Sequence, residues 1–313
     1  MKRDIVLLPL KEAIENYSEL IKKYAMNDRD IGNGLFIYVP ENLRIDIPYK
    51  SSLGNDNSYD IFYTLIILAP NSQLTYINET SLDNKKTSVS KFVDVYIDLG
   101  AHLYFLNLSR NSRETNETSK FYFSLRENAM GDLFFMDLGE GFVKKDVEVA
   151  LLGENATSNI KGLYILEENK LLQYHILQEH IAPFTNSNLV YKGILKDNSK
   201  GIFKGEIRIE REAKQSNAFQ VNHNLILGKN PSIDTTPILE IKTDDLKRCT
   251  HGATVGKVDE EVLFYMKTRG LDDKDAFKLL SVGFLEEIVE KLPSDSIKLE
   301  VWKYIKERLE VNS

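Results

Sequence analysis

The central region of this chain reads as strand after strand with no helix between them, and this limits its fold more than any other feature. Across residues 34–242, short segments rich in β-branched and aromatic residues alternate with turns that contain Gly, Asn and Asp. The clearest segments are residues 35–39, 92–99, 103–108, 121–125, 133–138 and 147–152. Because no helical pattern interrupts them, alternating strands and crossover helices are disfavoured, and a β-sandwich, a β-barrel or a β-helix remains.

A weak repeat favours the β-helix among these folds. In stacked coils each corner packs on the corner below, so a small residue is expected to recur there. Alanine follows a strand-ending turn six times, at intervals of 26 to 32 residues: Ala69, Ala101, Ala129, Ala156, Ala182 and Ala213. Six alanines can also align by chance, so the repeat does not exclude the other two folds.

Helical patterns occur at both ends of the chain. Apolar residues recur every three or four positions across residues 10–26, which predicts an amphipathic helix. After residue 257, Asp259, Asp272 and Ser294 can each cap a helix, while Gly270 and Pro293 provide stops. The sequence therefore predicts an N-terminal helical segment (1–33), a β core (34–256) and a C-terminal helical subdomain (257–313). The last is small for an independent core, so we expect it to pack on the β region or on a partner.

Composition and missing motifs exclude several functions. Forty basic and 47 acidic residues give a net charge of −7, which argues against a general nucleic-acid binder. The longest apolar run, residues 61–70, is shorter than the about 20 residues of a membrane helix. The run that follows the basic N-terminus, residues 5–10, contains Pro9 and is too short for a signal peptide. Together with a single cysteine, this predicts a cytoplasmic protein with neither a nucleic-acid nor a membrane partner. No phosphate-binding loop, dinucleotide fingerprint or nucleophile elbow is found, so we expect no nucleotide hydrolysis by the chain itself.

The densest group of reactive residues lies in residues 243–256, TDDLKRCTHGATVG. In an extended segment Cys249 and His251 point to the same face, where thiolate and imidazole could share a soft metal such as iron. Two ligands do not complete a site, so a second chain or a small ion would have to supply the rest. The alternative is a buried free cysteine beside a hydrogen-bonded histidine. Asp244 and Asp245 diverge on a strand and suit a turn. The remaining histidines show weaker spacing for chemistry: His102, His175, His180 and His223.

Six stretches of the chain form an ordered pattern: residues 146–156, 161–164, 180–195, 200–209, 217–227 and 237–270, with a looser seventh at 34–48. In this order they resemble the SufB/SufD family of iron–sulfur cluster assembly proteins. The resemblance implies a right-handed parallel β-helix flanked by N- and C-terminal helices. It also implies a dimer formed through the β-helix, with C-terminal helices that dock a SufC-type ATPase. Such a chain is a scaffold rather than an enzyme, because ATP is hydrolysed in the partner.

The resemblance is strongest to the D-type subunit, since residues 249–254 read Cys-Thr-His-Gly-Ala-Thr where the B type carries Glu-His-Glu. In the D type the matching histidine, His251, faces a B-type cysteine where a nascent cluster forms. The resemblance therefore makes His251 and Cys249 candidate ligands of a transient iron–sulfur cluster, shared with a partner chain, and implies no tightly bound cofactor. Four residues of the C-terminal helices are the candidate ATPase contacts: Phe264, Tyr265, Arg269 and Phe284.

Three alternatives remain open. The chain could be a homodimeric, SufB-like scaffold that works with the ATPase alone and uses Cys249. It could be a polysaccharide-cleaving β-helix enzyme, which would need acidic or basic residues grouped in a groove. It could also be a stand-alone zinc or iron carrier, for which the sequence shows too few ligands.

Overall fold

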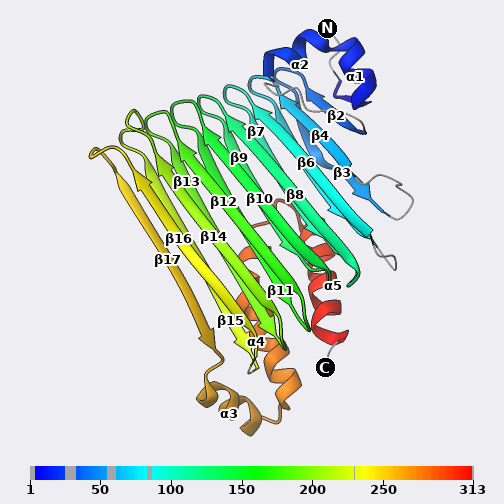
Figure 1. Ribbon diagram of the computed structural model, residues 1–313, viewed down its shortest axis with the longest axis vertical. Helices are drawn as coiled ribbons and strands as arrows, with labels where there is room; N and C mark the ends of the chain where they lie inside the picture. Colours follow the sequence, from blue (N-terminus) through cyan, green and yellow to red (C-terminus); the bar gives the residue numbers. More distant parts are fainter. Residues whose placement is uncertain (1–3, 25–32, 55–60, 83–86, 229, 312–313) are drawn as a thin grey trace.

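The structure is a computed structural model that describes residues 4–24, 33–54, 61–82, 87–228 and 230–311. It is a parallel β-helix in which the chain winds between two long sheets (Figure 1). The nine-stranded even sheet has the order β1-β2-β4-β6-β8-β10-β12-β14-β16, and the eight-stranded odd sheet has the order β17-β15-β13-β11-β9-β7-β5-β3. All neighbours are parallel except β1 and β2. The β-helix expected from the resemblance is confirmed.

The strands confirm every segment predicted from the sequence. The even sheet contains β1 (Val6–Pro9), β2 (Gly34–Val39), β4 (Ile61–Leu68), β6 (Thr87–Ile97), β8 (Thr115–Leu125), β10 (Phe142–Leu151), β12 (Leu171–His180), β14 (Lys200–Ile209) and β16 (Ser232–Ile241). The odd sheet contains β3 (Arg44–Leu53), β5 (Gln73–Thr80), β7 (His102–Ser109), β9 (Met130–Asp137), β11 (Thr157–Leu166), β13 (Asn186–Lys196), β15 (Asn217–Leu227) and β17 (Arg248–Lys257).

One corner of the coil repeats with nearly constant geometry. Seven successive turns place one residue in the left-handed region, with φ between 54° and 62°: Asn42, Asn71, Gly100, Asn128, Asn155, Phe184 and Gln215. The N–H of each donates to a carbonyl in the turn of the next coil, as from Asn71 to Leu99 at 2.8 Å. The six alanines lie in these turns, so the repeat seen in the sequence is structural. Asparagine recurs because it tolerates this conformation better than most residues with a side chain.

The helices cover parts of both outer faces. The predicted helix over residues 10–26 is instead two short helices, α1 (Leu10–Asn16) and α2 (Ser18–Tyr24), interrupted at Tyr17, where φ is −129°. Residues 25 and 26 lie outside the described residues. Both helices pack on the outer face of the even sheet near β2 and β4 (Figure 1).

The C-terminal helices are α3 (Glu260–Thr268), α4 (Asp273–Val289) and α5 (Asp295–Val311). Asp259 and Asp272 cap α3 and α4 as predicted, and the Ser294 hydroxyl accepts from the first turn of α5. Gly270 follows α3 with φ +89°. Helices α4 and α5 bury an apolar face on the outer face of the odd sheet. The C-terminal subdomain therefore packs on the β region, as its size suggested.

An ionic network lies inside the solenoid. Glu117, Asp137 and Lys145 are fully buried, and Lys91 is nearly so. The Lys91 Nζ is 2.9 Å from Glu117, Lys145 contacts both Glu117 and Asp137, and the Tyr174 hydroxyl donates to Asp137. Burial alone would raise the pKa of Glu117, but the charges of Lys145 and Lys91 outweigh it and hold that pKa well below its ordinary range.

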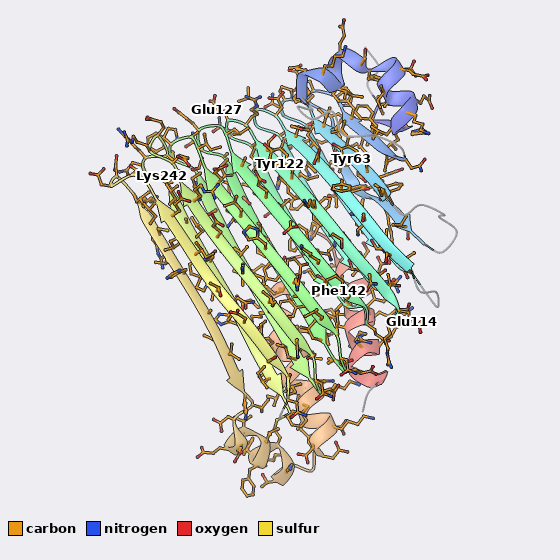
Figure 2. The ribbon with its side chains drawn as sticks, in the orientation of Figure 1. Tyr63, Glu114, Tyr122, Glu127, Phe142 and Lys242 are labelled. Carbon is orange, nitrogen blue, oxygen red and sulfur yellow. The ribbon has the colours of Figure 1, made fainter. Side chains whose placement is uncertain are left out.

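Glu117→Gln should lower the free energy of unfolding by about 3–5 kcal/mol, because it leaves two buried lysines short of a counter-charge. Urea unfolding followed by circular dichroism measures this loss. The matched control is Glu114→Gln, in the exposed turn before β8 (Figure 2), which should change stability by less than about 0.5 kcal/mol.

The effect of Glu117→Gln on the free energy of unfolding should depend on pH. Because the folded pKa of Glu117 lies below its ordinary value of 4.5, the carboxylate stabilises the fold fully above that pH and less as the pH falls below it. The stability gap between the wild type and Glu117→Gln should therefore narrow in acid. A gap that stays constant through the acid range would contradict the network's role.

Candidate functional site

The solenoid ends in two exposed strands. Inner strands such as β12 bury every second residue, whereas no residue of β16 or β17 is buried. Within the described ranges, no further strand pairs with either of them. Ile238, Ile241 and Val255 are exposed apolar side chains on these strands. Free N–H and C=O groups beside apolar side chains make such an edge a template for pairing with another chain.

Cys249 and His251 lie on β17. Their register partners on β15 are Ala218 and Gln220, which are buried side chains that point into the solenoid. Side chains that are in register on neighbouring parallel strands share a face. Both candidate ligands therefore lie on one face of the strand, as its alternation predicted, and the pairing with β15 shows that this is the inward face of the last coil.

The two residues differ in their surroundings. Cys249 packs, half-buried, against a small apolar cluster that includes Ala218 and Leu239, and this burial raises the pKa of its thiol. His251 is exposed, and it has no hydrogen-bond or ion-pair partner among the described residues. The cysteine thus fits the structural alternative in part, while the histidine is not the hydrogen-bonded residue which that alternative requires.

The site is incomplete as a metal site in one chain. In the part of the chain that the structure describes, no three His, Cys, Asp or Glu side chains gather closely enough to hold a metal ion. Iron sites in proteins use more ligands than the two on β17. Asp244 and Asp245 add none, because they lie in the turn before β17, where the Asp245 carbonyl accepts from the Gln215 N–H at 2.7 Å.

The other histidines are engaged elsewhere. His180 is buried, and its burial lowers its pKa to about 4, so it remains neutral. Their polar contacts are His180 with Thr185 and Ser187 (2.8 Å each), His102 with Asp132 (2.8 Å), His223 with Thr254 (2.7 Å) and His175 with Glu206 (3.3 Å).

The four candidate docking residues do not form one surface. On α3, Phe264 is 71% exposed and Tyr265 59% exposed, and the guanidinium of Arg269 lies 5.2 Å from the Tyr265 ring centroid. Phe284 lies on α4 and packs on the odd sheet, with the Nζ of Lys192 4.9 Å from its ring centroid. Helix α3 and its C-cap residue Arg269 thus present three of them, while Phe284 belongs to the contact between helix and sheet.

No prediction from sequence covers a groove of about 510 Å³ on the outer face of the even sheet. Its residues come from several coils, so they are far apart in the sequence. The sequence did contain one signal for it: charged or aromatic residues occupy successive outward positions of two strands. These are Lys120 and Tyr122 on β8, and Asp146 and Glu148 on β10.

Comparison with known proteins gives consistent matches. The family described as "SUF system FeS cluster assembly, SufBD core domain" matches residues 52–284. The chain is 30% identical over 243 residues to "Iron-sulfur cluster assembly protein SufD" of Escherichia coli K12, a match that covers 77% of this chain and 57% of that protein. It is 27% identical over 312 residues to an "Iron-sulfur cluster assembly SufBD family protein" of Staphylococcus aureus MRSA252, covering 94% and 67%. The chain thus spans just over half the length of the first relative. No helix among the described residues is long and apolar enough to cross a membrane.

The Cys249 thiol should react slowly with iodoacetamide at neutral pH, because its raised pKa leaves little of the reactive thiolate. The measurement is the alkylation rate of the native protein against that of free N-acetylcysteine. The same protein in urea is the control and should react at the rate of the free thiol, since this is the only cysteine. A native rate that equals or exceeds the unfolded rate would show an activated thiol instead.

Proposed function

The chain belongs to the SufBD family of iron–sulfur cluster assembly proteins, and from this premise we propose that it is a D-type scaffold subunit without turnover of its own. In this proposal it pairs with a B-type chain, docks a SufC-type ATPase and contributes to nascent cluster formation at the dimer interface. The observation that carries the proposal is the exposed end of the solenoid, where β17 holds an exposed His251 beside two sheet edges that pair with no strand the structure describes.

Both sheets end on the same coil, which suits pairing with a second β-helix. The edges of β16 and β17 are adjacent, so a partner that ends in the same way can extend both sheets at once. Backbone hydrogen bonds across the edges would supply affinity, and alternate side chains would supply specificity. Burial of Ile238 and Val255 would add an apolar contribution.

The cluster is cargo that the two chains would hold together. His251 offers an imidazole without a partner among the described residues, and Cys249 offers a thiol two positions away on the same face. Both are ligand types that iron accepts. Because the described part of the chain brings no third ligand to them, the partner's thiolate is expected to complete the set.

Helix α3 is the proposed contact for the ATPase. It lies beyond the end of the sheets (Figure 1), and Phe264, Tyr265 and Arg269 extend from it into solvent. Exposed aromatic residues next to an arginine are typical of the anchors of protein interfaces. ATP-driven closure of two docked ATPases would then shift the dimer towards a strained state that opens the interface.

His251→Ala should lower cluster formation by more than about tenfold while leaving the fold and ATPase binding unchanged, because it removes one exposed ligand. Anaerobic reconstitution of the complex, followed by its visible absorbance and iron content, measures the effect. His102→Ala on the odd sheet is the matched control and should keep the wild-type yield. A wild-type yield of cluster from His251→Ala would contradict the role of His251 as a ligand.

A second experiment distinguishes the heterodimer from the homodimer. Mild affinity purification from native cells, followed by native mass spectrometry, should recover an ATPase and a cysteine-bearing sister chain. Two copies of this chain with the ATPase alone would instead support the homodimer, in which Cys249→Ser should abolish cluster formation.

Phe264→Ala should weaken binding of the SufC-type ATPase by about tenfold or more, because a large exposed ring is removed from the proposed contact. Isothermal titration of the purified ATPase into the chain measures this affinity. The control is Leu299→Ala, which removes a side chain of equal exposure (71%) on α5. Equal affinities for both variants would place the docking surface elsewhere.

A further inference from the structure

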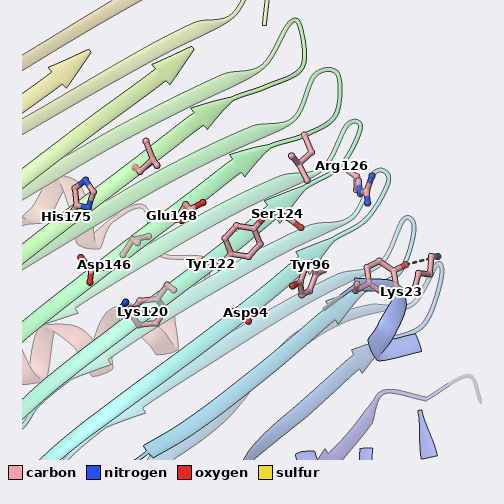
Figure 3. A pocket seen from close by; sticks show the side chains of 15 residues that line it. Lys23, Asp94, Tyr96, Lys120, Tyr122, Ser124, Arg126, Asp146, Glu148 and His175 are labelled. Carbon is pink, nitrogen blue, oxygen red and sulfur yellow. Dashed lines mark hydrogen bonds between the residues drawn. The ribbon is translucent and has the colours of Figure 1, made fainter. Parts of the chain in front are cut away.

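A second site lies on the outer face of the even sheet, away from β17 and α3. It is a groove of about 510 Å³, bounded by the end of α2 and floored by β6, β8, β10 and β12 (Figure 3). Along β8 it is lined by Lys120, Tyr122 and Ser124, which occupy outward positions, and by Arg126, which follows the strand. Six residues of strand span about 20 Å. This volume lies in the range of ligand-binding sites.

The charged groups of the groove are not satisfied by one another. Lys120 and Asp146 stand in register on neighbouring strands. Yet Lys120, Arg126, Asp146 and Glu148 form no hydrogen bond or ion pair among the described residues. Further along the same face the pattern is the opposite, because Arg208 pairs with three glutamates at 2.8 to 3.3 Å. The groove therefore contains unused donors and unused acceptors side by side.

One of these carboxylates is partly desolvated. Burial raises the pKa of Glu148, and the nearby charge of Glu179 raises it further, while Arg208 and His175 oppose the shift. A carboxylate that lies in a groove, loses hydration and gains no partner is characteristic of a binding site.

Aromatic rings form the wall of the groove. The ring centroids of Tyr24 and Tyr96 are 6.0 Å apart, and those of Tyr96 and Tyr122 are 6.2 Å apart. The three rings follow one another from α2 across β6 to β8, and Figure 3 labels the last two, Tyr96 and Tyr122. They offer flat apolar surface combined with hydroxyl groups that can hydrogen-bond.

We propose that this groove binds a neutral, hydroxyl-rich chain of the oligosaccharide class. A hydroxyl group both donates and accepts, so one ligand type can satisfy Asp146 and Glu148 as well as Lys120 and Arg126. The two carboxylates would repel a polyanion, and the two basic groups would repel a polycation, so both classes of ligand fit the groove less well. The apolar faces of sugar rings match the tyrosine wall around Tyr122. This site is independent of the proposed function in cluster assembly, and it is a site for binding, with no cleavage step.

The test uses the full chain and three neutral hexasaccharides: cellohexaose, maltohexaose and laminarihexaose. Saturation-transfer difference NMR and isothermal titration should show saturable binding of at least one of them. Tyr122→Ala should weaken that binding by about tenfold, because it removes the central ring of the wall. Glu148→Gln, which keeps the shape of the side chain, should weaken it as well.

Tyr104→Ala, which removes an outward tyrosine from the odd sheet, is the matched control and should bind as the wild type does. Circular dichroism confirms that each variant is folded. Failure of all three hexasaccharides to bind would overturn the proposal, and so would binding that Tyr122→Ala and Glu148→Gln leave unchanged. Saturable binding of an alternating Lys-Glu hexapeptide in place of the sugars would also overturn it, since the groove would then be a peptide site.

Discussion

Parallel, in-register hydrogen bonding between one coil and the next is the constraint on which the rest of this structure depends. It sets each strand beside the strand two places further along the chain, so side chains stack in columns along both sheets. It also requires every coil to turn in the same way, which is why one corner repeatedly uses a left-handed residue such as Asn71 or Asn128. No strand among the described residues pairs with the outer edge of the final coil. The backbone groups and the side chains of β17 are therefore accessible to a partner chain.

The stacking of coils also produces two outer faces, one on each sheet, and the helices cover them to different extents. The outer face of the odd sheet is closed by α4 and α5, whose apolar residues make it part of the core. The outer face of the even sheet is covered by α1 and α2 near β2, β4 and β6, and no other helix that the structure describes packs on it (Figure 1). The proposed dimer contact, the proposed ATPase contact and the proposed ligand site thus lie on separate surfaces and would not compete.

Sequence patterns anticipated what depends on near neighbours in the chain. Alternation placed Cys249 and His251 on one face, and the capping residues Asp259 and Asp272 marked helix starts, because these are local properties. The patterns could not place β17 at the edge of a sheet, because an edge is defined by what does not pair with it. The sequence patterns did not predict the groove for a related reason. Its residues Lys120, Asp146 and His175 are neighbours only because separate coils stack on one another.

The buried ionic network limits how the length of such a solenoid can change. Lys91, Glu117 and Lys145 come from β6, β8 and β10, which belong to three successive coils, and Asp137 on β9 completes the balance of charge. Deleting one of these coils would leave a charge in the interior without its counter-ion, a large cost in a low-dielectric core. Repeat proteins commonly gain and lose units during evolution. Because of these buried charges, we expect insertion or deletion of whole coils only outside β6–β10, so these central coils should be inherited as a block.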